Sequence, residues 1–194
     1  MKATSVVNIS KNGITLNNAP ILTELVTNDE TLPFGSIYKA LGLKYPKFYK
    51  MDQLCKLGFL GVEILKQTVD FSVFKDDRVA LLLQNSFSSL DTDSVHQKTI
   101  NEAEKPTSPA VFVYTLPNIV MGEIAIRNKF YGENLFTLAD VFSVTQFEDL
   151  VNVQFQLNKA DAVIGGWIEL FENDFNLRLY FLDKSDDKAQ YEIV

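Results

Sequence analysis

Hydrophobic residues recur at helical spacing in one part of the chain and form an unbroken run in another. Over Met51–Gln67 the apolar positions repeat every three or four residues, which predicts a helix with Asp52 in its first turn. Gly58 and Gly61 weaken this helix, so they indicate close packing of a neighbouring backbone, unless they are incidental weak points in an ordinary helix. Val79–Leu83 is a continuous apolar run between polar residues, which predicts a strand buried on both faces.

The rest of the chain alternates short apolar runs with helical patterns. Asn12-Gly13 is a hairpin signal, whereas Asn17–Pro46 has no sustained period and is expected to be irregular with at most one short helical turn. Further strands are expected at Ser5–Ile9, Ile14–Leu16, Asn134–Leu138, Ala160–Leu170 and Leu177–Leu182, and further helices at Asp91–Glu102, from Ser108-Pro109, at Ile119–Arg127 and at Ser143–Leu157. This alternation predicts an α/β fold with a mixed sheet, and residues 1–194 are expected to form a single domain.

Composition and charge narrow the classes of partner. The chain is 46% hydrophobic and 22% charged, as in an ordinary globular protein, but it has 15 phenylalanines, which need a large core or a partner. The net charge is -7 and no basic cluster is present, so nucleic acid and anionic membranes are poor candidates. The sequence has no signal-peptide pattern and no apolar run long enough to span a membrane, which makes the cytoplasm the expected location.

Few residues are suited to catalysis or metal binding. Cys55 is the only cysteine and His96 the only histidine, which excludes an intramolecular disulfide and a thiolate metal cluster. We interpret Cys55 as a buried core residue and His96 as a partly exposed helix residue. Ser143 has no Gly-x-Ser-x-Gly context for a hydrolase nucleophile. No metal or cofactor is expected.

Several ordered segments between Met51 and Gly166 resemble the N-terminal half of the β-ketoacyl synthase family. They are Lys47–Gln53, which is similar to the family's basic, methionine-aspartate helix opening, Ser108–Arg127, Gly132–Leu135 and Ala160–Gly166. The resemblance implies half of a thiolase-like fold, with a mixed, mostly parallel five-stranded sheet and helices packed on it.

One departure from the family pattern determines the functional expectation. The family's nucleophilic cysteine follows the strand that Gly132 opens, and ungapped counting places this position at Val141. Asp161 keeps the family's spacing from Gly132, which supports this alignment. Valine offers no nucleophile for acyl transfer, and the second half of the family's catalytic machinery is absent. No catalytic residue is therefore expected, and the chain is not expected to be an active enzyme.

The resemblance implies a chain-length-factor-type subunit that partners a full-length ketosynthase in fatty-acid or polyketide synthesis, with aryl-polyene and flexirubin-type pathways as the nearest parallels. Alternatives are a stand-alone module that binds an acyl chain or acyl carrier protein, and an enzyme with relocated thioester chemistry. The candidate tunnel and partner residues are Asn118, Met121, Gly122, Leu135, Phe136, Leu138 and Asp140. Met121 is the candidate length gate, Asn134–Leu138 is the expected dimer edge unless Lys129 and Glu133 blunt it, and Asp140 is either a helix cap or an interface hydrogen-bonding group.

Overall fold

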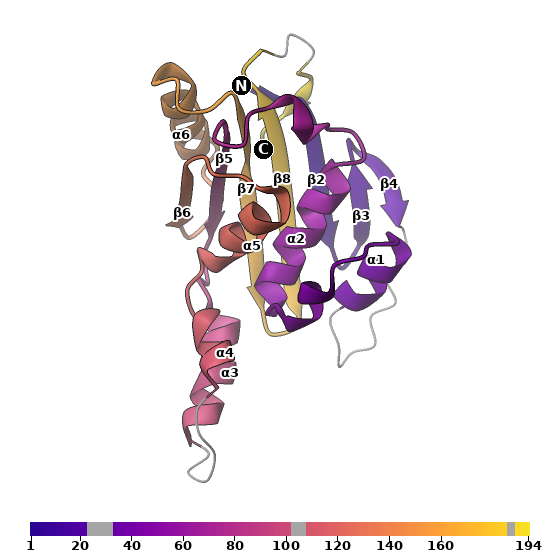
Figure 1. Cartoon of the computed structure of the whole chain (residues 1–194), viewed down its shortest axis with the longest axis vertical. Helices are drawn as coiled ribbons and strands as arrows, with labels where there is room; N and C mark the ends of the chain where they lie inside the picture. Colours follow the sequence, from indigo (N-terminus) through magenta and orange to yellow (C-terminus); the bar gives the residue numbers. More distant parts are fainter. Residues whose placement is uncertain (23–32, 102–107, 186–188) are drawn as a thin grey trace.

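A seven-stranded sheet forms the centre of the molecule (Figure 1). The computed structural model describes residues 1–22, 33–101, 108–185 and 189–194. The strands follow the order β4-β3-β2-β8-β7-β5-β6, and a two-stranded sheet of β1 and β9 lies beside them. Their bounds are β1 Lys2–Ala3, β2 Ser5–Ser10, β3 Gly13–Leu16, β4 Ala19–Leu22, β5 Val79–Asn85, β6 Asn134–Leu138, β7 Ala162–Phe171, β8 Asp174–Asp183 and β9 Tyr191–Glu192.

The sheet is mixed, as expected, and it contains seven strands where five were expected. Only β5 pairs in parallel with its neighbours, β6 and β7, and the other pairings in the seven-stranded sheet are antiparallel. The strands β2, β4, β5, β6 and β7 nevertheless run in one direction, against β3 and β8. The additional strands arise because the chain turns twice at its start, and β3 and β4 extend the sheet beyond β2.

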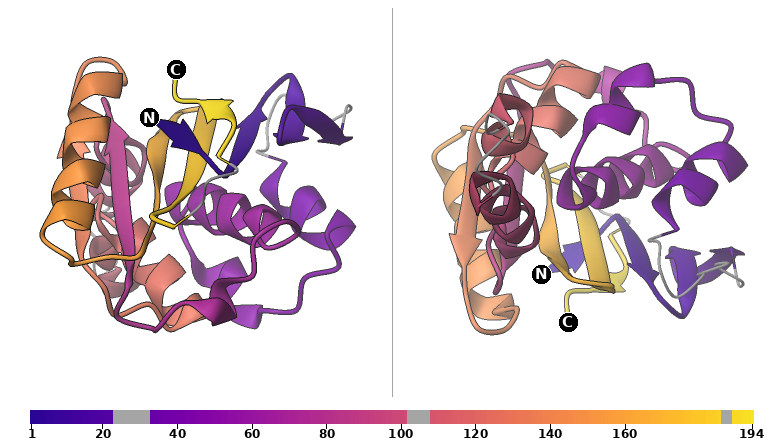
Figure 2. Two further views of the ribbon diagram at one scale, coloured as in Figure 1. Left: turned by 90° about the horizontal axis from the view of Figure 1, so that it is seen from above. Right: turned by 90° about the horizontal axis from the view of Figure 1, so that it is seen from below.

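Helices cover both faces of the sheet (Figure 2). The helices α2, Gln53–Leu65, and α5, Ile119–Asn128, pack on one face, and α6, Val144–Gln156, packs on the other. The short helix α1, Phe34–Ala40, contacts α2, and two 3-10 turns occupy Pro46–Lys50 and Phe71–Val73. Asn17–Pro46 is thus more regular than expected, because its described part contains β4 and α1; residues 23–32 lie outside the described residues.

Alternating side chains of β5 enter two separate cores. Leu81 and Leu83 belong to the larger core under α2 and α5, whereas Ala80 and Leu82 belong to the smaller core under α6. All residues of β5 are buried, which confirms the strand predicted from its unbroken apolar run. Successive residues of a strand point to opposite faces of the sheet. A strand whose two faces are both covered therefore needs apolar residues at every position.

The predicted first helix is confirmed, and its glycines pack closely. Asp52 is the N-cap residue of α2 and accepts a hydrogen bond from the backbone N–H of Cys55 at 2.9 Å. A Cβ atom added at Gly58 would lie 2.4 Å from Cγ2 of Val120, on α5. Glycine is therefore required for α2 and α5 to approach each other here.

Two further helices form an arm that projects from the body of the molecule (Figure 1). The arm comprises α3, Leu90–Asn101, and α4, Pro109–Val113, and α3 starts one residue before the earliest predicted start. Ser108 caps α4, as predicted. Glu102, the predicted last residue of α3, lies outside the described residues.

Candidate partner-binding edge

The strand β6 forms one edge of the sheet, and its bounds match the prediction. Within the described residues it pairs only with β5, from Leu81↔Asn134 to Asn85↔Leu138. Backbone bonds at both ends, Leu81 N–H to Glu133 O and Ala139 N–H to Asn85 O, fix which residues face β5. Because a parallel ladder uses alternate residues, the N–H and C=O groups of Asn134, Phe136 and Leu138 point away from β5, toward the open edge.

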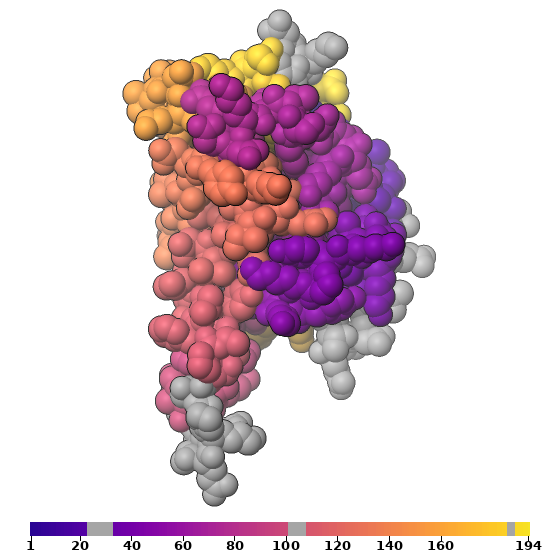
Figure 3. All heavy atoms as spheres, in the orientation of Figure 1, coloured from indigo at the N-terminus to yellow at the C-terminus, as the bar shows by residue number. Residues whose placement is uncertain are grey.

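Apolar side chains are exposed along this edge. Leu135 is 40% exposed and Leu138 is 59% exposed. Phe136 is half-buried and packs against the larger core. In the space-filling view, the segment that contains β6, coloured salmon to orange, borders the molecule below α6 (Figure 3). The edge therefore combines unpaired backbone groups with apolar surface.

Val141 lies in the turn between β6 and α6 and is 72% exposed. Asp140, beside it, is also exposed and does not cap the helix. Ser143 is the N-cap of α6 and accepts a hydrogen bond from Gln146 N–H at 3.3 Å, so the helix-cap interpretation of Asp140 was wrong. The geometry is a strand, a short turn and a helix N-terminus, with valine in the turn.

The polar and nucleophilic residues named from the sequence are not assembled around this turn. Cys55 lies on α2 and is 2% exposed, and burial raises the pKa of its thiol further above the usual value. His96 lies on α3, half-buried beside the ring of Phe112. No group of three His, Cys, Asp or Glu residues within the described part of the chain could hold a metal ion.

The three candidate residues around α5 have different surroundings. Asn118 is exposed and its side chain makes no capping hydrogen bond. Met121 is 1% exposed and belongs to the larger core. Gly122 is half-buried, and a Cβ atom added there would contact nothing within 4 Å. Met121 is thus a packed core residue, whereas Asn118 and Gly122 border open space.

Two buried carboxylates could not be recognised from the sequence, because nothing in their spacing indicated burial. Glu63 of α2 accepts a hydrogen bond from Nε of Arg127, on α5, at 3.0 Å and forms an ion pair with Lys66. Burial alone would raise the pKa of Glu63, but the hydrogen bonds from Arg127 and Lys66 lower it overall. Glu123 forms an ion pair with Lys47 at 2.7 Å. Both carboxylates connect α2 and the preceding turn to α5.

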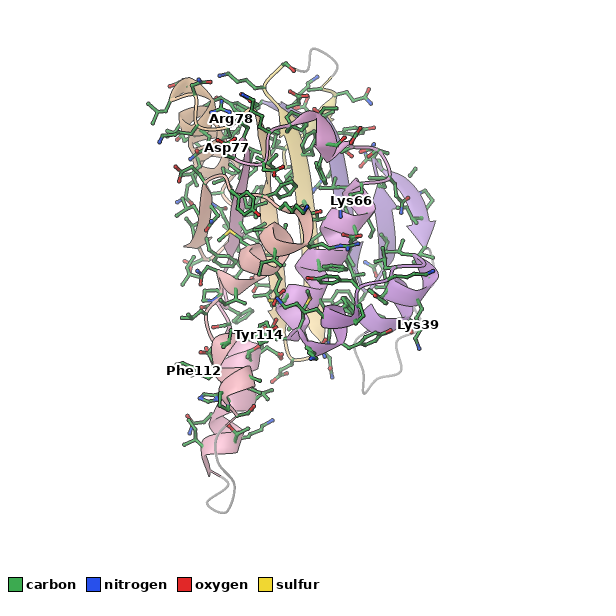
Figure 4. The ribbon with its side chains drawn as sticks, in the orientation of Figure 1. Lys39, Lys66, Asp77, Arg78, Phe112 and Tyr114 are labelled. Atoms are coloured by element: carbon green, nitrogen blue, oxygen red, sulfur yellow. The ribbon has the colours of Figure 1, made fainter. Side chains whose placement is uncertain are left out.

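Two polar contacts hold the arm against the body, and a third joins the two ends of the arm. Thr92 donates a hydrogen bond to Oδ2 of Asp52 at 2.7 Å. Ser89 donates to the backbone carbonyl of Thr115 at 2.6 Å, and the Tyr114 hydroxyl donates to Glu123 at 3.0 Å. Figure 4 labels Tyr114 near the base of the arm and Phe112 further out. The arm also exposes apolar side chains, namely Val95, Ile100, Phe112, Val113 and Leu116.

No family model and no curated protein matches this sequence. The structure, however, resembles solved structures that contain ketosynthases. The chain described as the ishigamide ketosynthase/chain length factor aligns with a TM-score of 0.67 and 14% identity over 95% of this chain and 62% of that chain. A complex of the ketosynthase ApeO with its chain length factor ApeC, from Xenorhabdus doucetiae, aligns with a TM-score of 0.61 and 12% identity over 96% and 81%.

A third structure contains a type II PKS acyl-carrier protein in complex with its ketosynthase bound to a hexaketide. It aligns with a TM-score of 0.66 and 12% identity over 94% of this chain and 62% of that chain. The present chain thus spans less than two thirds of two of the matched chains. These likenesses establish an α/β fold similar to that of the matched ketosynthase and chain length factor structures. Among the described residues, no helix is long and apolar enough to cross a membrane.

Proposed function

We propose that this chain, as one domain, is a non-catalytic subunit of chain-length-factor type that pairs with an active ketosynthase in polyketide synthesis, with aryl-polyene synthesis as the nearest parallel. The main observation in support is the exposed turn at Val141, next to an edge strand with unpaired backbone groups. The structural likeness to chains from ketosynthase and chain length factor complexes supports the same role.

The open edge of β6 provides the partner site. Its outward N–H and C=O groups would form an antiparallel ladder with a strand of the ketosynthase, which would join two sheets into one. Leu135, Leu138 and Val141 would be buried beside that ladder. Such an edge is an aggregation hazard in a free monomer, and pairing with a partner removes the hazard. Glu133 lies 3.8 Å from Lys159, so its charge is already engaged within the chain.

Thioester chemistry would belong to the partner. Acyl transfer needs a thiolate near a base, and the turn between β6 and α6 holds Val141 in place of a nucleophile. The hydroxyl of Ser143 is used to cap α6, and Cys55 is buried on a different helix. Acyl carrier protein would deliver substrate to the ketosynthase, with this chain shaping the space beyond the reacting carbon.

The length-determining residues would be near the start of α5 and the end of β6. Gly122 and Asn118 border open space, and Asp140 is exposed where a partner would approach. Met121 would affect product length only indirectly, by supporting this surface, because its side chain lies in the core under α5. A larger residue at Gly122 would therefore shorten the product, whereas one at Met121 would first disturb the fold.

The decisive experiment is co-expression with the candidate ketosynthase, followed by size-exclusion chromatography of variants at Leu138. Leu138→Pro removes an outward N–H without removing a bond to β5, and Leu138→Ala is the matched control that removes only the side chain. We expect Leu138→Pro to abolish the heterodimer and Leu138→Ala to weaken it, with circular dichroism unchanged in both. If Leu138→Pro binds as tightly as Leu138→Ala, β6 is not the pairing edge.

A further inference from the structure

A cavity of about 220 Å³ lies where the arm meets the start of α2. Its wall includes Met51 and Lys56 from the α2 region, Thr92 and Val95 from α3, Val111 from α4 and Tyr114 just after α4. None of its lining residues belongs to β6 or to the turn at Val141. The cavity is therefore separate from the proposed partner edge, and its role does not depend on that proposal.

Most polar groups of the wall already have partners. Asp52 accepts hydrogen bonds from Cys55 N–H at 2.9 Å and from Thr92 Oγ1 at 2.7 Å. Asp91 accepts one from the backbone N–H of Glu172 at 3.1 Å. The hydroxyl of Tyr114 donates to Glu123 at 3.0 Å. These contacts fix the wall and occupy both carboxylate oxygens of Asp52 and one of Asp91.

Lys56 differs from these groups. Its side chain is half-buried and, among the described residues, it has neither a hydrogen bond nor an ion pair. Burial lowers the pKa of its ammonium group, against a smaller opposing effect of Asp52. A cation that is partly removed from water gains more from an anion than an exposed one does. Lys50, at the same cavity, adds a second positive charge.

We propose that this cavity binds a medium-chain carboxylate, with the carboxylate on the Lys56 ammonium group and the alkyl chain against Met51, Val95 and Val111. The size is suitable, because an engineered apolar cavity of about 150 Å³ binds benzene, and 220 Å³ leaves room for a short alkyl chain. An alkyl chain would cover the apolar wall while the anion compensates the lysine. The site needs no partner subunit.

Isothermal titration calorimetry of the chain with octanoate tests the assignment. We expect saturable binding, weakened about tenfold by Lys56→Met, since this change removes a charge-assisted hydrogen bond and keeps the length of the side chain. Lys39→Met is the matched control, because Lys39 lies on α1 and does not line the cavity. It should leave the affinity unchanged. Octanol should bind equally to the parent chain and to Lys56→Met.

A filling variant separates binding in the cavity from binding elsewhere. Val95 is 46% exposed, so Val95→Trp can be accommodated by the fold and places an indole ring over the cavity. It should abolish the binding of both octanoate and octanol while circular dichroism remains that of the parent. Failure of octanoate to bind the folded chain, or equal affinity in the parent chain and Lys56→Met, would overturn the proposal. Both outcomes are independent of whether the chain forms a heterodimer with a ketosynthase.

Discussion

The contact between Gly58 of α2 and Val120 of α5 gives a sharp test of the packing. A Cβ atom at Gly58 would lie 2.4 Å from Cγ2 of Val120 and 3.1 Å from Cδ1 of Ile168. Both neighbours are buried and belong to secondary structure, so neither can move aside freely. Gly58→Ala should therefore destabilise the fold even though alanine is the better helix former.

The change in the free energy of unfolding for Gly58→Ala follows from two opposing effects. Overpacking a core typically costs about 1–3 kcal/mol, and replacing glycine by alanine within a helix returns about 1 kcal/mol. We expect a net loss of up to about 2 kcal/mol for Gly58→Ala, toward the upper end of that range since the clash is with a β-branched side chain. Gly122→Ala is the matched control, because its Cβ would meet nothing within 4 Å, and it should stabilise the chain by about 0.5–1 kcal/mol.

Urea unfolding of the two variants and of a Val120→Ala background measures these values. In the Val120→Ala background the clashing methyl group is gone, and Gly58→Ala should become neutral or stabilising. The resulting interaction free energy should lie between about 0.5 and 3 kcal/mol, the range for residues in contact. Equal effects of Gly58→Ala and Gly122→Ala, or additivity in the cycle, would refute the close approach of α2 and α5.

Three further predictions concern buried groups. Cys55 should resist iodoacetamide at neutral pH in the folded chain and react only after unfolding, because burial raises its pKa and blocks access; rapid labelling of the native chain would contradict this. Thr92→Val should speed amide hydrogen exchange in α3 but not in α6, since it removes the bond to Asp52 that holds the arm; unchanged exchange in α3 would show that other contacts hold it. The pKa of Glu63 is lower in the folded chain than in the unfolded one, so its contribution to stability is present above the unfolded pKa and is lost as the pH falls through the folded pKa. Glu63→Gln should therefore lower stability at neutral pH and reduce the loss on acidification, measured by urea unfolding from pH 7 to pH 3; an identical pH profile would contradict this.

Most elements could be predicted because their signals are local. Helix α2 has an N-cap, an apolar period and a defined length, and β5 has an unbroken apolar run. The strand β4 was missed because Pro20 interrupts its sequence pattern, and proline is tolerated there since β4 is the other edge of the sheet. The count of seven strands depends on tertiary pairing, which no local pattern specifies.

The candidate edge was predictable in position but not in detail. The resemblance predicts the nucleophile position at Val141, and the structure adds that this side chain is exposed in the turn before α6. The role of Ser143 as the helix cap, rather than Asp140, depends on the geometry of the turn and could not be chosen from composition. The setting of Lys56 could not be predicted either, because the residues that line its cavity come from α2 and from the arm, which are distant in sequence.

The exposed apolar side chains of β6 and of the turn after it are too few to hold a partner by themselves. Leu135, Leu138 and Val141 are 40%, 59% and 72% exposed, and completing their burial would contribute roughly 3–5 kcal/mol at ~1.5–3 kcal/mol for each fully buried side chain. Association itself costs about 4–15 kcal/mol, so this contribution at best barely offsets the cost. A stable heterodimer therefore needs more buried surface than the edge alone provides.

The arm is the nearest source of that surface. It leaves the sheet from the end of β5, where Asn85 is paired with Leu138, so its base adjoins the proposed edge. Phe112, further along the arm, is 61% exposed. A large aromatic side chain at such a position contributes more on burial than any single residue of β6. If the partner pairs with β6, the interface must then continue from the strand onto the arm, and the polar contacts that fix the arm to α2 would also fix the shape of the interface.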